Sequence, residues 1–347
     1  MTRVKRNIDV INYGTLNKGT AFTKLEGEYI MKKAIILILV LFISTSVYAQ
    51  FKGHNTLGDY GIMAGSQPDP GLYASAFYLN YHTDKILDAN GDQIAFDPGN
   101  PGDISVNALA GLVWYVSDFK ILGANYGAFV VFPFVNSALE APVLGLEETS
   151  SFSFSDLYIQ PLNLGWKTNM AHYTAGLGIF IPTGNYEPAG DSNVGLGMWS
   201  FEIYAGATFF FDQAKSWHFS AIAWYEIHTE KKDTDVKVGD ILSLEGGLGK
   251  SFLGGALTVG LAYYAQWKIS EDDLGTTIPQ PSGNMFAFDK HQVYAIGPEA
   301  TIPVPIDNKL VAMINARFFW EFGARSMAEG NTLTITATFP IPSIPLN

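Results

Sequence analysis

Cysteine is absent from the 347-residue chain, and charged residues are scarce, at 16% of the total. A chain without cysteine forms no disulfide, so its stability must come from packing and hydrogen bonds. Long apolar runs are also missing beyond residue 49, although 48% of all residues are hydrophobic. The main part of the chain therefore has no stretch of about 20 apolar residues that could cross a bilayer as a helix.

Basic residues are a minority. The chain has 21 Lys and Arg against 33 Asp and Glu, a net charge of −12. Seven of the basic and three of the acidic residues precede residue 51, so the remainder has 14 basic and 30 acidic residues and a net charge of −16. Such a surface repels a phosphate backbone. We therefore expect no nucleic acid among the partners.

The one long apolar run, Ala34–Ser44, follows Met31-Lys32-Lys33 and precedes Val47-Tyr48-Ala49. A short basic region, an apolar stretch and a small-x-small end are typical of a signal peptide, here residues 31–49, cut after Ala49. The run is too short for a permanent anchor. Because signal peptides start at the chain start, we interpret residues 1–30 as a mis-assigned upstream extension.

Beyond Ala49, large apolar residues alternate with small or polar ones, as in half-buried β-strands. The clearest case is 257–269, where Leu257, Val259 and Leu261 share one face with Tyr263. Twelve such segments can be recognised. They cover residues 71–82, 103–116, 121–134, 155–167, 171–182, 197–211, 217–228, 241–251, 256–269, 291–303, 309–322 and 331–341.

Every second connection between these segments is short, such as Ser117–Lys120 and Thr168–Met170, and the others are mostly long and polar, such as 83–102. Tight turns on one side and long loops on the other are typical of outer-membrane barrels. The sequence predicts an all-β fold: a transmembrane antiparallel β-barrel of 12 strands over residues 71–341, with periplasmic termini and a tail at 342–347. Residues 50–70 form a periplasmic or lumen segment, and we favour the lumen.

The polar face of each predicted strand was assigned to the barrel interior. The resulting polar cluster comprises Asp156, Gln160, Glu202, Glu226, Glu245, Glu299, Arg317 and Glu321, and His172, His218 and His228 face inward with it. One arginine among so many carboxylates leaves the cluster under-compensated. The charges either line or gate a solute route, or they pair with one another and fill the lumen.

Aromatic side chains stand between these polar residues. The predicted aromatic track comprises Tyr78, Phe180, Tyr204, Phe210, Trp224, Tyr264 and Phe319. A lumen so crowded with rings is not a wide water-filled pore. It favours a narrow barrel with a partly apolar route.

Several blocks also match a known family. They are Gly61–Ser66, Pro68–Tyr73, Asp156–Pro161, Gly176–Gly178, the motif residues Pro182, Thr183, Gly184 and Tyr186, then Trp199, Gly297–Glu299 and Arg317–Phe322. With these blocks the chain resembles the outer-membrane transporter family labelled putative meta-pathway of phenol degradation. Met198 departs from it, because a more polar residue is expected there. The resemblance implies passage of small hydrophobic or aromatic compounds, although fold alone does not fix a substrate.

We therefore expect a channel in the Gram-negative outer membrane that is not an enzyme and that takes up small hydrophobic solutes passively. Two alternatives stay open: a hydrophilic porin-like channel, and an outer-membrane hydrolase with an activated serine beside a histidine. The expected partners are outer-membrane lipid and lipopolysaccharide, the solute and the barrel-assembly machinery. Asp88–Asp92 matches only part of a calcium loop, so we expect no metal and no cofactor.

Overall fold

A computed structural model describes residues 51–95, 101–141, 146–188, 193–276, 290–307 and 309–342. The predicted upstream extension 1–30 and signal peptide 31–49, and all but the first residue of the predicted tail, lie outside these ranges. The described ranges contain no helix that is both long and apolar enough to cross a membrane.

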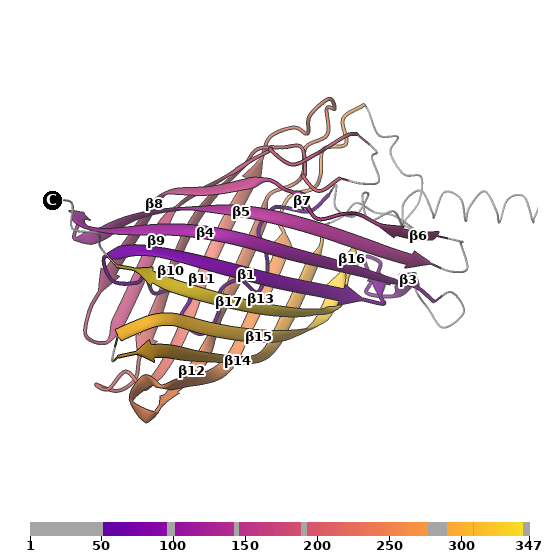
Figure 1. Cartoon of the computed structure of the whole chain (residues 1–347). Coiled ribbons are helices and arrows are strands. Elements are labelled where there is room, and N and C mark those ends of the chain that lie inside the picture. Colours follow the sequence, from indigo (N-terminus) through magenta and orange to yellow (C-terminus); the bar gives the residue numbers. More distant parts are fainter. Residues whose placement is uncertain are drawn as a thin grey trace, which may run out of the picture. The chain divides into compact units, whose positions relative to one another are not determined.

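Twelve long strands make the barrel (Figure 1). They are β1 (Gly71–Thr83), β4 (Asp103–Ile121), β5 (Ala124–Ala141), β8 (Leu157–Lys167), β9 (Ala171–Ile181), β10 (Ser200–Phe210), β11 (Trp217–His228), β12 (Ile241–Phe252), β13 (Leu257–Lys268), β14 (Gln292–Ile306), β15 (Lys309–Arg325) and β17 (Asn331–Ile341). Each pairs antiparallel with its neighbours, and β1 pairs with both β4 and β17. The sheet therefore closes without a free edge, as a barrel in lipid requires.

The predicted strand boundaries hold closely except in β4 and β5. The short turn predicted at Ser117–Lys120 is wrong, because β4 continues through a register shift to Ile121. The chain reverses instead at Leu122 and Gly123, which have φ of 48° and 82°. A two-residue hairpin with a type I′ turn needs φ above zero at both positions. The strands are consequently 19 and 18 residues long.

Short strands decorate the end of the barrel that carries the long connections, called here the long-loop end. The first of these connections forms a hairpin of β2 (Ile86–Leu87) and β3 (Gln93–Ala95), which pairs with β16 (Met327–Ala328). In its turn, the Asp88 carboxylate accepts the backbone N–H groups of Asn90 and Asp92. β6 (Leu146–Thr149) and β7 (Ser153–Phe154) pair with β5. A 3₁₀ turn, η2 (Leu253–Gly255), occupies one connection at the opposite, short-turn end.

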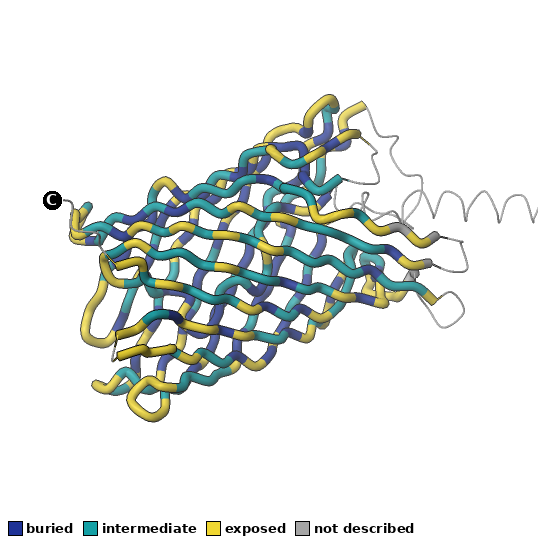
Figure 2. The backbone as a smooth tube through the Cα atoms, in the orientation of Figure 1, coloured by how far each residue is buried: buried dark blue, intermediate teal, exposed yellow. Residues whose placement is uncertain are grey.

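The outer face of the wall is apolar and exposed, and exposed and covered residues alternate along each strand (Figure 2). Between 37% and 58% of the surface is exposed for Leu109, Val113, Ile203, Leu248, Ile296, Ile314 and Ile335. Large exposed rings stand near both ends, for example Tyr115 and Trp217 at the short-turn end and Trp320 and Phe322 at the long-loop end. This belt with aromatic margins is the lipid-facing surface of a membrane barrel.

Candidate functional site in the barrel lumen

Residues 51–70 run through the inside of the barrel from one end to the other. At the long-loop end, Lys268 Nζ donates to the Phe51 carbonyl at 2.7 Å, and Phe51 packs against Val236 and Leu274. At the short-turn end, Asp69 accepts from Lys167 Nζ at 2.6 Å, just before β1 begins. We call residues 51–70 the lumen segment.

Three glutamates on neighbouring parts of the wall hold the backbone of the lumen segment. Glu226 accepts the N–H of His54 at 2.7 Å, Glu245 accepts the N–H of Tyr60 at 3.1 Å, and Glu299 accepts the N–H of Ile62 at 2.9 Å. A buried carboxylate is tolerated when hydrogen bonds replace its water. Backbone N–H groups therefore stabilise the negative charges of glutamates that a single arginine could not neutralise.

Arg317 holds the same segment through its carbonyls. Its Nη1 donates to the carbonyls of Gly58 and Asp59 at 3.3 and 2.9 Å, and its Nε lies 3.1 Å from Glu299. Gly58 has a φ of 86°, and a Cβ there would lie 2.9 Å from the Phe319 ring. Glycine is the residue that fits this position.

The His54 ring of the lumen segment forms hydrogen bonds through both of its nitrogens. Its Nδ1 lies 2.7 Å from Ser200 Oγ, its Nε2 lies 2.9 Å from Asp156 Oδ2, and its ring stacks on Phe180 at 4.7 Å. Burial lowers the pKa of this imidazole, whereas hydrogen bonds to Asp156 and Glu226 raise it by more, so the pKa lies above its ordinary value of 6.5. The protonated ring can donate from both nitrogens, which suits two acceptors.

Ser200, His54 and Asp156 form the combination of residues found in hydrolase triads. Ser200 is fully buried, and Asp156 also accepts the N–H groups of Gly184 and Leu196. A catalytic serine must be reached by its substrate. The three residues therefore fix the position of the lumen segment, and Ser200 is not accessible as a nucleophile.

Six of the seven rings of the predicted aromatic track are buried on the inner face: Phe180, Tyr204, Phe210, Trp224, Tyr264 and Phe319. Several of them meet the lumen segment directly. Trp224 lies 4.8 Å from the Tyr60 ring, and Ile62 packs in one cluster with Tyr264 and Phe319. These buried rings therefore form the packing surface for the lumen segment.

Tyr78 is different, and its assignment to the lumen is wrong. Thr334 bonds the Gly58 carbonyl inside the barrel and pairs with Leu79, so Leu79 faces inward and Tyr78 faces outward. On the outer face the Tyr78 hydroxyl donates to Asn107, which also accepts from Asn80. Assigning every polar strand face to the interior fails at this point of the wall.

The remaining polar residues of the predicted cluster bond to rings and to one another. Tyr158 donates to Glu202 at 2.7 Å, Tyr204 donates to Gln160 at 2.7 Å, and Tyr264 donates to Glu321 at 2.7 Å. The three predicted histidines also lie inside: His172 bonds Ser66, His228 pairs with Glu226 at 3.0 Å, and His218 is buried beside Phe210. The lumen face from β8 to β15 is thus a continuous polar and aromatic network.

The motif after β9 begins the loop between β9 and β10, at the long-loop end. Pro182 follows the last residue of β9, Thr183 Oγ1 accepts the N–H of Leu157, and Gly184 donates its N–H to Asp156. The Tyr186 ring lies under Lys231 Nζ, and burial lowers the pKa of Lys231 to about 7.

The end of this loop bonds Thr229, the residue that follows β11. The Trp199 N–H bonds Thr229 Oγ1, whereas the Trp199 ring is exposed. Met198 is 1% exposed and packs with Leu196, Val238 and Ile241, which explains an apolar residue there.

Sequence reasoning missed an apolar inner face on β1, β4 and β5. Its inward positions follow from the register with Leu79 and the threonines of β17. They are Phe77, Leu79, Val106, Ala108, Ala110, Leu112, Trp114, Phe129, Val131, Pro133 and Val135. All but Leu79 and Phe129 are partly exposed, whereas inward residues of β9 to β13 are mostly buried. Asn80, Asn107 and Asn136 share the opposite, outward face of these strands. They therefore indicate that here the polar face is outside and the apolar face is inside.

Comparison with solved structures supports the fold. The COG4313 outer membrane channel from Pseudomonas putida F1 matches with a TM-score of 0.67 at 12% identity, over 83% of this chain and 100% of that one. The β domain of the Bordetella autotransporter BrkA matches with 0.43 at 10% identity, over 79% and 100%, and the P. putida toluene transporter TodX with 0.38 at 10%, over 80% and 92%. Only the first score is high enough to support a shared fold.

A comparison with curated proteins gives no significant match. A family model, described as Putative MetA-pathway of phenol degradation, matches residues 83–337. That match covers most of the barrel, from the end of β1 into β17. The chain belongs to this family of outer-membrane β-barrel proteins.

Proposed function

We propose that the protein is an outer-membrane channel for passive uptake of small hydrophobic or aromatic compounds, and that they move along the inner face of β1, β4 and β5. The observation that carries this proposal is the contrast within the lumen. The lumen segment packs against β8 to β15, while the apolar residues of β1, β4 and β5 keep part of their surface accessible.

The chemistry of that face selects apolar solutes. Between Val106 and Leu112 on β4 its inward side chains are Val106, Ala108, Ala110 and Leu112, opposite Val131, Pro133 and Val135 of β5. These side chains offer no hydrogen bond to replace the water that a sugar would lose. An aromatic hydrocarbon loses little on entering such a lining and gains from apolar contact. This argues against the hydrophilic porin-like alternative.

The hydrolase alternative has weaker support. Ser200, whose Oγ lies 2.7 Å from His54 Nδ1, is fully buried under the lumen segment. Family membership supports a transport role but does not name the solute.

The test is permeation through proteoliposomes that contain the purified protein. We expect rapid entry of an aromatic hydrocarbon and slow entry of a sugar of similar size, relative to protein-free liposomes. Equal entry of both would identify a hydrophilic pore. Release of fatty acid from the liposome phospholipid that disappears in Ser200→Ala would identify an enzyme.

A further inference from the structure

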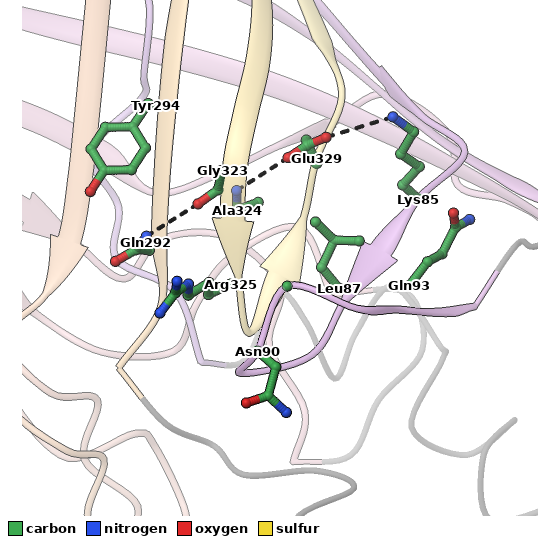
Figure 3. Close-up of a pocket in the computed structure, with 11 residues that line it drawn as sticks. Lys85, Leu87, Asn90, Gln93, Gln292, Tyr294, Gly323, Ala324, Arg325 and Glu329 are labelled. Carbon is green, nitrogen blue, oxygen red and sulfur yellow. Dashed lines mark hydrogen bonds and ion pairs between the residues drawn. The ribbon is translucent and has the colours of Figure 1, made fainter.

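A solvent-open cavity of about 510 Å³ lies at the long-loop end, where the first hairpin meets the ends of β14 and β15 (Figure 3). Lys85, Asn90 and Gln93 contribute from the hairpin side, and Gln292 and Arg325 from the barrel side. Two of its lining residues, Leu87 and Ala324, also pack in the hydrophobic cluster that holds Ile62 of the lumen segment. The lining residues do not include the inner face of β1, β4 and β5, so the cavity lies outside the proposed solute route.

Arg325 gives this cavity an uncompensated positive charge. Glu329, the acid that lines the cavity, is engaged by Lys85 at 3.6 Å and by the Ala324 N–H at 3.2 Å. Within the described parts of the chain, the Arg325 side chain makes no ion pair or hydrogen bond, and it is exposed. A free guanidinium can bind one phosphate group through two parallel N–H bonds.

An aromatic surface lies directly beside Arg325 on the outer face of the wall. Trp267 Nε1 donates to the Tyr294 hydroxyl at 3.1 Å, and the Tyr294 ring stacks on Phe322 at 5.9 Å. Arg325 pairs in register with Gln292, immediately beyond the Tyr294–Phe322 pair. Such rings mark the boundary between acyl chains and headgroups. The rings therefore sit where the acyl chains end, and Arg325, which lies beyond them toward the long-loop end, sits among the headgroups.

We propose that this site binds a lipopolysaccharide molecule of the outer leaflet, with a lipid A phosphate on Arg325 and an acyl chain along Trp267, Tyr294 and Phe322. The long-loop end of an outer-membrane barrel faces the outer leaflet, where this glycolipid is found. The Arg325 guanidinium supplies the local positive charge that a phosphate needs, because Glu329, the acid that lines the cavity, already has its own partners. Lys85 lies on the opposite side of the cavity, where it can approach a second phosphate oxygen.

The experiment measures binding of lipid A to the purified detergent-solubilised protein, comparing bisphosphorylated lipid A with the same lipid stripped of phosphate. Arg325→Gln should weaken binding of the phosphorylated form about tenfold, because a charge-assisted hydrogen-bond pair is lost. Binding of the phosphate-free form should stay unchanged. Lys309→Gln, an exposed cation at the short-turn end, is the matched control and should change neither.

Arg325→Glu serves as a second variant and should abolish the preference for the phosphorylated lipid. Equal affinity of native protein and both Arg325 variants would overturn the proposal, as would an equal loss for both lipids. Competition by inorganic phosphate at millimolar concentration would also overturn it, because the site would then bind free anions rather than a lipid.

Discussion

The two halves of the lumen solve the same packing problem in opposite ways. From β8 to β15 the wall presents carboxylates, amides and rings, and the lumen segment fills the space beside them with its own backbone. Over residues 77–79 of β1, 106–114 of β4 and 129–135 of β5 the inward side chains are aliphatic or aromatic, and most of them keep part of their surface accessible. A polar wall needs partners for every buried group, whereas an apolar wall can remain uncovered beside a hydrophobic solute. The difference teaches that polar lumen residues here bind the protein's own chain.

Removing the lumen segment should have the largest effect on this contrast. Deletion of residues 53–65 frees Glu226, Glu245 and Glu299 for water, so that half of the lumen should conduct ions. We expect single-channel conductance in planar bilayers to rise on the order of tenfold. The apolar face is intact in this variant, so uptake of an aromatic hydrocarbon serves as the internal control. Unchanged conductance would show that the segment does not limit the pore.

Blocking the apolar half should have the next largest effect. Ala110 faces inward between Phe77 and Pro133, so Ala110→Phe narrows the proposed route. We expect uptake of an aromatic hydrocarbon in proteoliposomes to fall about tenfold.

The neighbouring residue provides the matched control. Gly111 lies on the outer face with no atom within 4 Å of a built Cβ, so Gly111→Phe adds the same ring toward lipid. Uptake should be unchanged in this variant. An equal loss of uptake in Ala110→Phe and Gly111→Phe would contradict a solute route along this half of the barrel.

Breaking the charge balance of the filled half should reduce stability. Arg317→Met leaves Glu299 buried without its cationic partner and frees the carbonyls of Gly58 and Asp59. The free energy of unfolding should drop by about 3 kcal/mol, as for other broken buried pairs. Urea-induced unfolding in micelles measures it, and exposed Lys309→Met should shift the midpoint little. A midpoint equal to that of the native protein would mean that the ion pair contributes no net stability.

The smallest expected effect is a dependence on pH at His54. Its pKa is raised, so the stabilisation from the protonated ring is complete below pH 6.5 and is lost as the pH rises through the raised pKa. Asp156 and Glu226 are the acids that face the ring, and Ser200 is its neutral partner.

Ion conductance of the native channel should therefore fluctuate more at alkaline than at mildly acidic pH. His54→Gln should remove that dependence, at a cost on the order of 1 kcal/mol. The same pH profile in native protein and variant would assign the titration to another group.

The strands could be predicted well from the sequence, because alternation and loop length are local features. Residues 217–228 and 331–341 match β11 and β17 without change. The turn at Leu122 and Gly123 was not predicted, because β4 continues beyond Ser117 through a register shift that alternation alone does not reveal.

The orientation of β1, β4 and β5 could not be predicted by the same rule. Asn80, Asn107 and Asn136 lie on outward positions in register with one another, so polarity marks the outer face there. The hydrogen-bond partners of the glutamates also could not be predicted, because almost any residue can supply a backbone N–H. Nothing in the side chains of Tyr60 or Ile62 indicates a bond to Glu245 or Glu299.

The position of Phe51 has a consequence for biogenesis. The chain enters β1 at the short-turn end, yet Phe51 lies at the opposite mouth, beside Val236 and Leu274. The seam between β1 and β17 joins the first and last strands, so it can seal only after the whole barrel sequence is available. The peptide from Phe51 onward must therefore be threaded before that seam seals, and a folded domain fused ahead of it would obstruct closure.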